Sequence, residues 1–202
     1  MSSSTSPTVR AIRPSAARER LLTTAARLFY AEGIHTVGVD RVIAEAKVTR
    51  ATFYRHFPGK EDLVVAYLEM RDHEIRAAAG GIDHVNAPAR DKAVLLLHGV
   101  GDELCKTGFR GCPFINAAAE YPDPEHPAHQ VVTTHRAWFH ATLVSLLEEA
   151  DHPDPYFGAA TLVMLRDGAM VAGNLESAEQ ARLALIRAGK AFLGLGAAPS
   201  GA

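Results

Sequence analysis

Apolar residues recur three and four positions apart through most of this chain, and that spacing constrains its fold more than any other feature. The first such stretch starts at Ser15 and contains Leu21, Leu22, Ala25, Leu28 and Phe29. A repeat of this kind places the apolar side chains on one face of an α-helix. The chain shows no alternating apolar run flanked by turn residues, which is the pattern that strands require. We therefore expect an all-α fold.

Breaks in the periodic pattern divide the chain into about nine helices. Gly33, Pro58-Gly59 and Gly80-Gly81 each end a periodic stretch, and the proline-rich segment 121–127 forces a loop. The expected helices cover 15–32, 38–46, 49–56, 60–79, 88–108, 114–120, 128–150, 155–175 and 178–194. The segment before them is rich in Ser, Thr, Pro and Arg and has no apolar period, which indicates a flexible basic arm.

Charge is distributed unevenly along the chain. The 202 residues carry a formal net charge of -2, which by itself argues against nucleic acid as a partner. Residues 1–60, however, hold ten basic and four acidic side chains, a net charge of +6, so the remaining residues carry -8. Such asymmetry indicates a basic segment that binds nucleic acid, joined to a part with another role.

The segments 38–46 and 49–56, joined by a tight connection, have the arrangement of a helix-turn-helix motif. Phe53 and Phe57 lie four positions apart and are expected on the inner face. The other side chains of 49–56 supply hydroxyl, imidazole and guanidinium groups, which suit phosphate oxygens and base edges. Lys60 adds a cation at the start of the next helix, where exposed N–H groups also favour a phosphate. The sequence therefore predicts that 49–56 reads DNA.

The run from Val39 to Leu63, with the pattern Phe-Tyr-x-His-Phe-x-x-Lys-Glu-x-Leu at its core, resembles the DNA-binding domain of the TetR family of one-component bacterial transcriptional regulators. The resemblance extends back to Ser15. It implies a homodimeric regulator, most often a repressor, that binds a palindromic double-stranded operator and is released by a small molecule. Residue by residue, the DNA contacts that it implies are Thr49, Arg50, Thr52, Tyr54, His56 and Lys60. We add Arg55, which neighbours them.

Two positions depart from the family's usual pattern. Lys47 stands in the turn where glycine is common, so it must either adopt a positive φ or shift the turn. Val37-Gly38 stands where Ser or Thr often begins the supporting helix, so a side-chain cap and one phosphate contact would be missing. Neither departure removes the motif.

We expect a three-helix DNA-binding domain at 15–62 and a helical effector-binding and dimerisation domain at 63–195. The basic arm occupies 1–14, and a flexible tail occupies 196–202.

The run from Phe109 to Glu120 is the most distinctive part of the second domain. Its Gly-Cys pair followed by Ala-Ala-Glu resembles the matching region of family members that respond to N-ethylmaleimide, which implies that Cys112 senses electrophiles or oxidants. Arg110 and a helix N-terminus would then activate the thiol. The alternative is a small, buried, unreactive cysteine. The candidates for an effector pocket or sensor are Phe109, Cys112, Phe114, Asn116, Glu120, Trp138, Phe139 and Met170. Such a set suits a small apolar or electrophilic effector.

The last two long helices, expected near 155–175 and 178–194, carry small residues at close spacing. They also have more apolar surface than packing on one side can cover. We expect these helices to form the homodimer interface, as in the family's four-helix arrangement. A palindromic operator also requires two reading helices, about one turn of DNA apart.

Other observations bear on location and on competing functions. The chain has only two cysteines, Cys105 and Cys112, and no leader-like segment opens it, so we expect a cytoplasmic location. No apolar run reaches the roughly 20 residues of a membrane span. The ten histidines lack the spacing of a metal site, and nothing indicates a cofactor. We do not expect an enzyme. The alternatives are a small cysteine-dependent enzyme, in which Cys112 acts with His135 and Glu120, and a DNA-binding protein without an effector.

Overall fold

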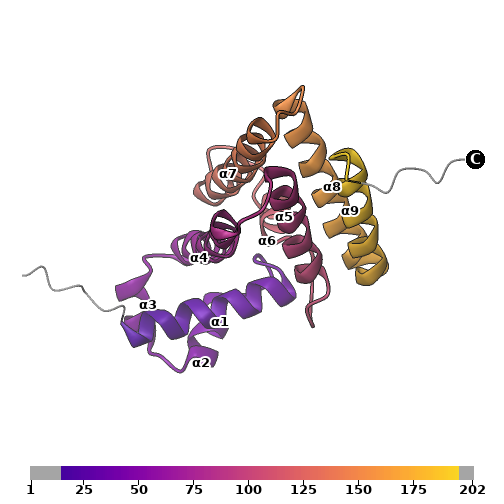
Figure 1. The fold of residues 1–202 in the computed structure, drawn as a ribbon. Coiled ribbons are helices and arrows are strands. Elements are labelled where there is room, and N and C mark those ends of the chain that lie inside the picture. The colour runs from indigo at the N-terminus through magenta and orange to yellow at the C-terminus, as the bar shows by residue number, and fades with distance from the viewer. Residues whose placement is uncertain (1–14, 196–202) are drawn as a thin grey trace, which may run out of the picture.

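The computed structural model describes residues 15–195, which form nine α-helices and one short 3-10 helix (Figure 1). The helices are α1 (Ala16–Glu32), α2 (Val39–Ala46), α3 (Arg50–His56), α4 (Lys60–Gly80), η1 (Gly81–His84), α5 (Ala89–Leu104), α6 (Pro113–Glu120), α7 (Pro127–Glu149), α8 (Pro155–Leu175) and α9 (Ala178–Phe192). No strand occurs among these residues, so the all-α prediction is confirmed. The predicted arm at 1–14 and tail at 196–202 lie outside the described residues.

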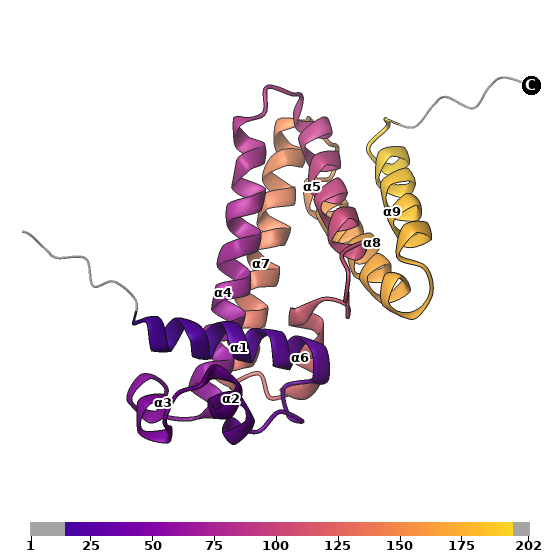
Figure 2. The same ribbon diagram turned by 90° about the horizontal axis from the view of Figure 1, so that it is seen from below.

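The first three helices gather at one end of the molecule, and we call them the head (Figure 2). α1 packs on both α2 and α3, and the apolar residues that it buries include Leu21 and Leu28. Val42 of α2 and Phe53 of α3 are fully buried against this core. Because the apolar period of each helix faces inward, the polar side chains of α3 are left on the outside.

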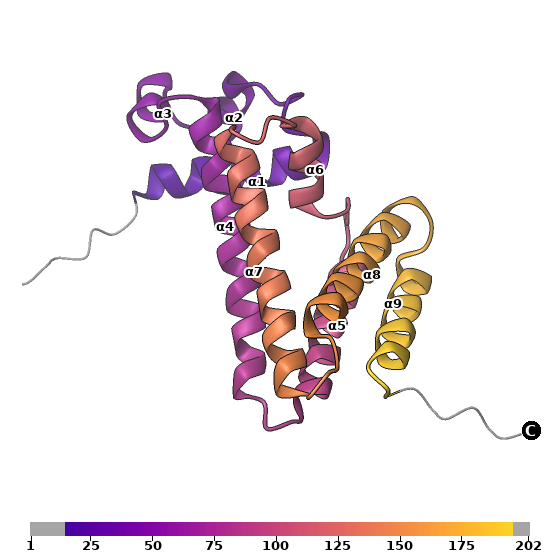
Figure 3. The ribbon, with the colours of Figure 1, turned by 90° about the horizontal axis from the view of Figure 1, so that it is seen from above.

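The remaining helices form the body. α4 and α7 run side by side away from the head, and α8 and α9 lie at the far edge of the molecule (Figures 2 and 3). α5 packs on α7 and α9, where its Leu97 closely approaches Gly189. A Cβ built at Gly189 would lie only 2.1 Å from the Leu97 Cδ1 atom, so a larger residue there would force the Leu97 side chain to move. The short α6 lies beside the end of α1 and connects the body to the head (Figure 3).

Most helix boundaries follow the predictions to within a few residues, but the end of α5 does not. α5 stops at Leu104, and Cys105, predicted inside a helix, is its exposed C-terminal cap. Beyond it the chain turns: the Lys106 N–H bonds the Glu103 carbonyl and the Phe109 N–H bonds the Lys106 carbonyl. The predicted stop signal, Gly108, has a φ of 77° but lies in this turn, not at the helix end.

Candidate functional site

α3 begins at a side-chain cap that the sequence predicts. The Thr49 Oγ1 atom accepts a hydrogen bond from the Thr52 N–H at 3.1 Å and lies 2.9 Å from the Thr52 hydroxyl. Phe53 and Phe57 are buried, as expected, and Tyr54 lies edge-on to Phe53 with 5.2 Å between ring centroids. The helix is therefore held from below by its aromatic side chains and from its start by Thr49.

All seven residues expected to contact DNA are exposed or half-buried on the outer side of the head. Tyr54 is 49% exposed, although its ring is aromatic. The Arg50 guanidinium pairs with Asp40 at the surface, an interaction worth at most about 1 kcal/mol, so Arg50 is readily released to another anion. The Lys60 ammonium lies 3.4 Å from the His35 carbonyl oxygen, and the His56 ring lies 3.3 Å from the Ser15 hydroxyl. Positive charge and hydroxyl groups thus gather around α3.

Lys47 adopts one of the two conformations expected for it in the turn. It adopts φ 53° and ψ 51°, the left-handed conformation, and caps α2, with its N–H directed at the Ala44 and Ile43 carbonyls. The turn is therefore not shifted, and the lysine side chain is carried at the cost of backbone strain. The other departure also has the expected effect, because Gly38 provides no side-chain cap for α2.

The replacement Lys47→Gly should raise the free energy of unfolding by about 0.5 to 1 kcal/mol, because glycine removes the left-handed strain while losing more chain entropy. Urea denaturation at fixed pH measures the change. The control is Ala44→Gly, an exposed position in the interior of α2, which should lower the free energy by about 1 kcal/mol. A loss of stability in Lys47→Gly equal to that of the control would contradict the prediction.

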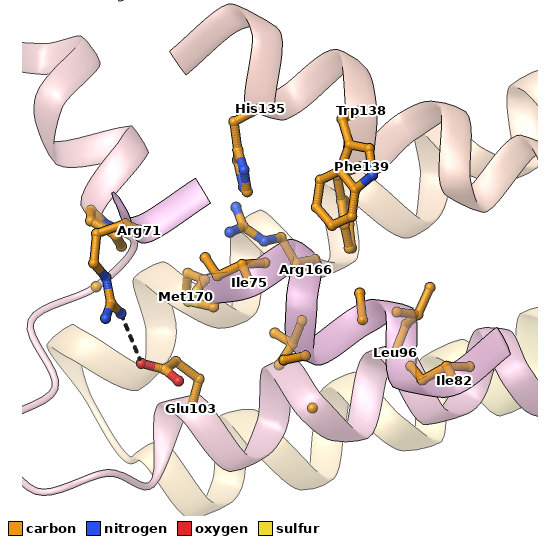
Figure 4. Close-up of a pocket in the computed structure, with 16 residues that line it drawn as sticks. Arg71, Ile75, Ile82, Leu96, Glu103, His135, Trp138, Phe139, Arg166 and Met170 are labelled. Atoms are coloured by element: carbon orange, nitrogen blue, oxygen red, sulfur yellow. Dashed lines mark ion pairs between the residues drawn. The ribbon is translucent and has the colours of Figure 1, made fainter. Parts of the chain in front are cut away.

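The body contains an apolar cavity of about 160 Å³ between α4, α5, α7 and α8 (Figure 4). Its apolar wall is formed by Ile75, Ala78, Ala79, Ile82, Leu96, Val100, Trp138, Phe139 and Met170. The polar side chains that line it are Arg71, Glu103, His135 and Arg166, and Gly111 and the first residue of α6, Pro113, complete the lining. Arg71 and Glu103 form an ion pair at 3.5 Å across the cavity's edge. A concave apolar space with a few convergent polar groups is the usual form of a small-molecule site.

Arg166 is the most buried cation of the cavity, with 7% of its surface exposed. Its Nη1 atom donates to Asp167 at 2.7 Å, and its Nη2 atom donates to the Cys112 Sγ atom at 3.1 Å. Burial by itself lowers the pKa of Arg166, but Cys112 and Asp167 outweigh burial and hold the pKa above its ordinary value. Arg166 therefore remains charged inside the body.

His135 lies beside Arg166 and is 3% exposed. Its ring stacks on Phe114 at 3.7 Å, and its Nδ1 atom lies 2.7 Å from the Asp72 carboxylate. Burial lowers the pKa of His135, the Asp72 hydrogen bond opposes that effect, and the Arg166 charge adds to it. His135 is therefore neutral near pH 7, with its Nδ1 proton directed at the carboxylate, which can only accept.

Two sets of hydrogen bonds tie the end of α1 to α6 and the segment before it. The Tyr30 hydroxyl donates to the Gly111 carbonyl and accepts from the Arg110 N–H, both at 2.9 Å. The Glu120 carboxylate accepts from the backbone N–H groups of Ile34 at 2.8 Å and of His35 at 2.5 Å. Because Gly111 also lines the cavity, one peptide group joins the cavity wall to the head.

The eight predicted pocket residues do not all meet at the cavity. Trp138, Phe139 and Met170 line it, whereas Cys112 and Phe114 lie directly behind Arg166 and His135. The other three lie elsewhere: Phe109 lines a separate hollow beside α1, Asn116 bonds the Arg110 carbonyl, and Glu120 bonds the head. The guanidinium at the Cys112 thiol belongs to Arg166 and not to Arg110, which sequence proximity suggested.

Three residues that line the cavity, Arg71, Glu103 and Arg166, were not predicted from the sequence. The hydrogen bond of Tyr30 to the cavity wall was not predicted either. Arg166 carries a signal that could have been found, because it lies four positions after the buried Leu162 and three before the buried Ala169. A charged residue on the buried face of a helix is rarely without a partner or a function. Tyr30 carries no such signal, since its partners Arg110 and Gly111 lie far along the chain.

Among residues 15–195, no three His, Cys, Asp or Glu side chains are grouped so as to hold a metal ion. Both Cys105 and Cys112 are free thiols, the first exposed and the second buried. Within the same residues, no helix has the length and apolar character needed to cross a membrane.

Comparison with known proteins connects the head with a family of regulators. The sequence profile of the bacterial regulatory proteins of the tetR family matches residues 21–67. HTH-type transcriptional regulator LmrA of Bacillus subtilis (strain 168) is 30% identical over 105 residues, which are 51% of this chain and 56% of that protein. The chain thus matches little more than half the length of this relative.

Similarity to solved structures extends over the body as well. The crystal structure of SCO4454, a TetR-family transcriptional regulator from Streptomyces coelicolor, superimposes with a TM-score of 0.86 at 47% identity. That match covers 89% of this chain and 95% of SCO4454. The reduced form of E. coli NemR has the same fold, with a TM-score of 0.77 at 20% identity over 93% of this chain and 100% of NemR.

Proposed function

The chain belongs to the TetR family of transcriptional regulators, and from that premise we propose that it is a homodimeric repressor. In this proposal α3 binds a palindromic operator, and a small-molecule effector releases the protein from the DNA. Regulators of this family bind DNA and are not enzymes. The proposed contacts are those named above for α3 and its flanks, from Thr49 to Lys60. The observation that carries the proposal is the helix-turn-helix itself, which presents cations and hydroxyls on its outer side over buried phenylalanines.

Binding to DNA tests the proposal directly. A palindromic duplex, selected from a random-sequence library with the wild-type protein, should bind two protomers in a gel-shift titration. A duplex with one half-site scrambled should bind far more weakly, because a two-fold symmetric dimer then reads only one half. Equal affinity for the selected and the fully scrambled duplex would exclude a specific operator.

The cavity supports release by an effector. Its wall includes Gly111, whose carbonyl is bonded by Tyr30 of α1, so a molecule that displaces this wall acts on the head through one hydrogen bond. Such coupling requires that the effector bind the two states of the protein with different affinity. A DNA-binding protein without an effector would show no thermal stabilisation by any member of a small-molecule panel.

Cys112 remains a candidate sensor within the same proposal. Cys112 is 2% exposed and does not line the cavity, but its Sγ atom lies 3.1 Å from Arg166, which does. Alkylation of Cys112 that leaves operator affinity unchanged would exclude this role. The enzyme alternative has less support, because Glu120 is engaged with the head and does not join Cys112 and His135.

An exposed apolar stripe on α8 supports the homodimer. Phe157, Met164, Val171 and Leu175 are exposed, and Met164 and Leu175 are 64% and 73% exposed. Together with Thr161 and Gly168 they follow alternating spacings of four and three, the repeat of a helix that pairs with another helix. The small residues Gly158 and Gly173 do not belong to this stripe, since they face Leu147 and Leu104 within the chain. We assign the stripe, with the exposed Leu183 of α9, to the dimer interface.

The hydrogen bonds between the Glu120 carboxylate and the head should protect two backbone amides from hydrogen exchange. In Glu120→Gln, the amide hydrogens of Ile34 and His35 should exchange at least about tenfold faster, because two hydrogen bonds to a charged acceptor are weakened. Amide exchange followed by NMR measures the effect. The control is Glu125→Gln, an exposed glutamate in the loop after α6, which should leave both amides unchanged. Unaltered protection in Glu120→Gln would show that this link does not hold the head.

A further inference from the structure

The two ends of the cavity differ in chemistry. Arg71 and Glu103 lie at one end, and Trp138, Phe139, Leu96 and Ile82 form the other (Figure 4). His135 and Arg166 lie between them, with the Arg166 guanidinium 5.7 Å from the Phe139 ring centroid. A molecule that fills this space therefore needs an apolar body and one polar group.

The charge of the cavity lining favours an anion. The lining residues contribute two guanidinium groups, Arg71 and Arg166, against the single carboxylate of Glu103. Arg71 is already paired with Glu74 at 2.7 Å and with Glu103 at 3.5 Å. His135 is neutral, so it adds no charge of its own. Arg166 pairs with Asp167 through Nη1 at 2.7 Å, but its Nη2 atom has only the Cys112 sulfur as a described partner, so Arg166 is the lining guanidinium best placed to accept an anion.

Arg166 also has hydrogen-bonding capacity to spare. A guanidinium group carries five N–H donors, and its described bonds use one for Asp167 and one for the Cys112 sulfur. Sulfur is a weak acceptor, so the second bond satisfies the donor poorly. Arg166 lines the cavity while almost entirely buried, which means that an entering oxygen anion would meet it away from water.

The size and the walls of the cavity limit the apolar body. Its volume is about 160 Å³, and a dry apolar cavity of roughly 150 Å³ is large enough for one benzene molecule. Trp138 and Phe139 offer aromatic surfaces to such a ring. The space thus suits one ring with a short substituent.

From this combination we propose that the cavity binds aromatic monocarboxylates with a single ring, the ring against Trp138 and Phe139 and the carboxylate on Arg166. The proposal rests on the effector role of the cavity proposed above and names the chemical class of that effector.

Four probes of similar size separate the ligand classes. Benzoate and phenylacetate carry the anion, benzamide is the neutral control and benzylamine the cationic control. In isothermal titration of the wild-type protein, the better of the two carboxylates should bind roughly tenfold or more tightly than benzamide, since benzamide lacks the negative charge and the second acceptor oxygen that a guanidinium group can bind. Benzylamine should not bind measurably. Benzamide binding as tightly as both carboxylates, or no binding of either carboxylate, would overturn the proposal.

Variants of Arg166 test whether this residue binds the carboxylate. Arg166→Gln should lose roughly tenfold or more in carboxylate affinity and change benzamide affinity little. The matched control is Arg136→Gln, since Arg136 bonds the other oxygen of Asp167 at 2.7 Å but does not line the cavity, and it should bind as the wild type does. Equal losses in the two variants would overturn the assignment. If Arg166→Gln does not fold, Arg166→Lys, which keeps the charge, should still prefer carboxylate to amide, and the wild-type selectivity decides the ligand class alone.

Operator binding measured on the same samples distinguishes a failure of this proposal from a failure of the proposed function. Wild-type protein is titrated with its selected duplex in the absence of carboxylate and again with the better carboxylate at saturation. The affinity for the operator should be lower when the carboxylate is present. Specific operator binding together with no carboxylate binding would overturn the ligand class and leave the regulator intact. Carboxylate binding without specific operator binding would do the reverse.

Discussion

Replacing both Arg50 and Tyr54 with alanine is expected to lower the affinity for the operator about a hundredfold or more, because each base or phosphate contact is worth about 1 to 3 kcal/mol and occurs twice in a dimer. The effect should come from lost contacts and not from unfolding, since both side chains stand outside the core of the head. Fluorescence anisotropy with the selected palindromic duplex measures it.

An arginine-to-alanine replacement far from α3 provides the control for that result. Arg90 is exposed at the start of α5, far from α3, so Arg90→Ala should retain wild-type affinity (Figure 2). The salt dependence gives a second, independent readout, because losing a phosphate contact reduces the slope of log affinity against log salt by about 1. Operator affinity within threefold of the wild type in the double variant, roughly 0.7 kcal/mol, would refute the assignment of α3.

The double replacement Met164→Lys with Val171→Lys should convert a dimer into monomers, with the dimer dissociation constant raised about a hundredfold or more, because four like charges would be brought together in an apolar interface. Both side chains belong to the exposed stripe of α8 and contribute little to the core of their own chain. The monomer should therefore remain helical and melt cooperatively. Sedimentation equilibrium measures the association and circular dichroism the fold.

A charge added outside the stripe should have no such effect. Ser145 is exposed near the end of α7, so Ser145→Lys should remain dimeric. In the lysine pair, operator affinity should fall together with dimerisation, because two linked reading helices bind far more tightly than one. A lysine pair that remains dimeric would place the interface elsewhere, and a monomer with undiminished operator affinity would remove the need for a dimer.

Local signals explain how much of this molecule could be predicted from the sequence. Thr49, Pro155 and Ser177 are start signals that act through adjacent backbone, and each marks a helix start in the structure. The helix-turn-helix was accessible for the same reason, since its pattern lies within one short continuous segment. The end of α5 was misjudged because glycine at 108 signals a turn without indicating whether the helix has already ended.

The cavity could be predicted only in part, because it is assembled from helices that are distant in sequence. Trp138 and Met170 could be named as apolar candidates, but nothing in their spacing shows that α4 and α5 complete the same wall. Glu120 is a polar residue of the kind that lines pockets, but its carboxylate instead accepts hydrogen bonds from the backbone of the head. Tertiary packing, which periodicity does not encode, decided between these two roles.

The two faces of α8 have different surroundings, and under the proposed function this separation has an evolutionary consequence. Phe157, Met164 and Val171 point out of the body, whereas Arg166 and Met170 point into the cavity. Under the proposed function, substitutions on the inner face after gene duplication can change which compound is recognised without altering the exposed stripe that we assign to the dimer interface. Substitutions on the outer face can prevent the two copies from mixing as heterodimers. A single helix thus lets paralogues diverge in chemical specificity and in pairing by independent steps.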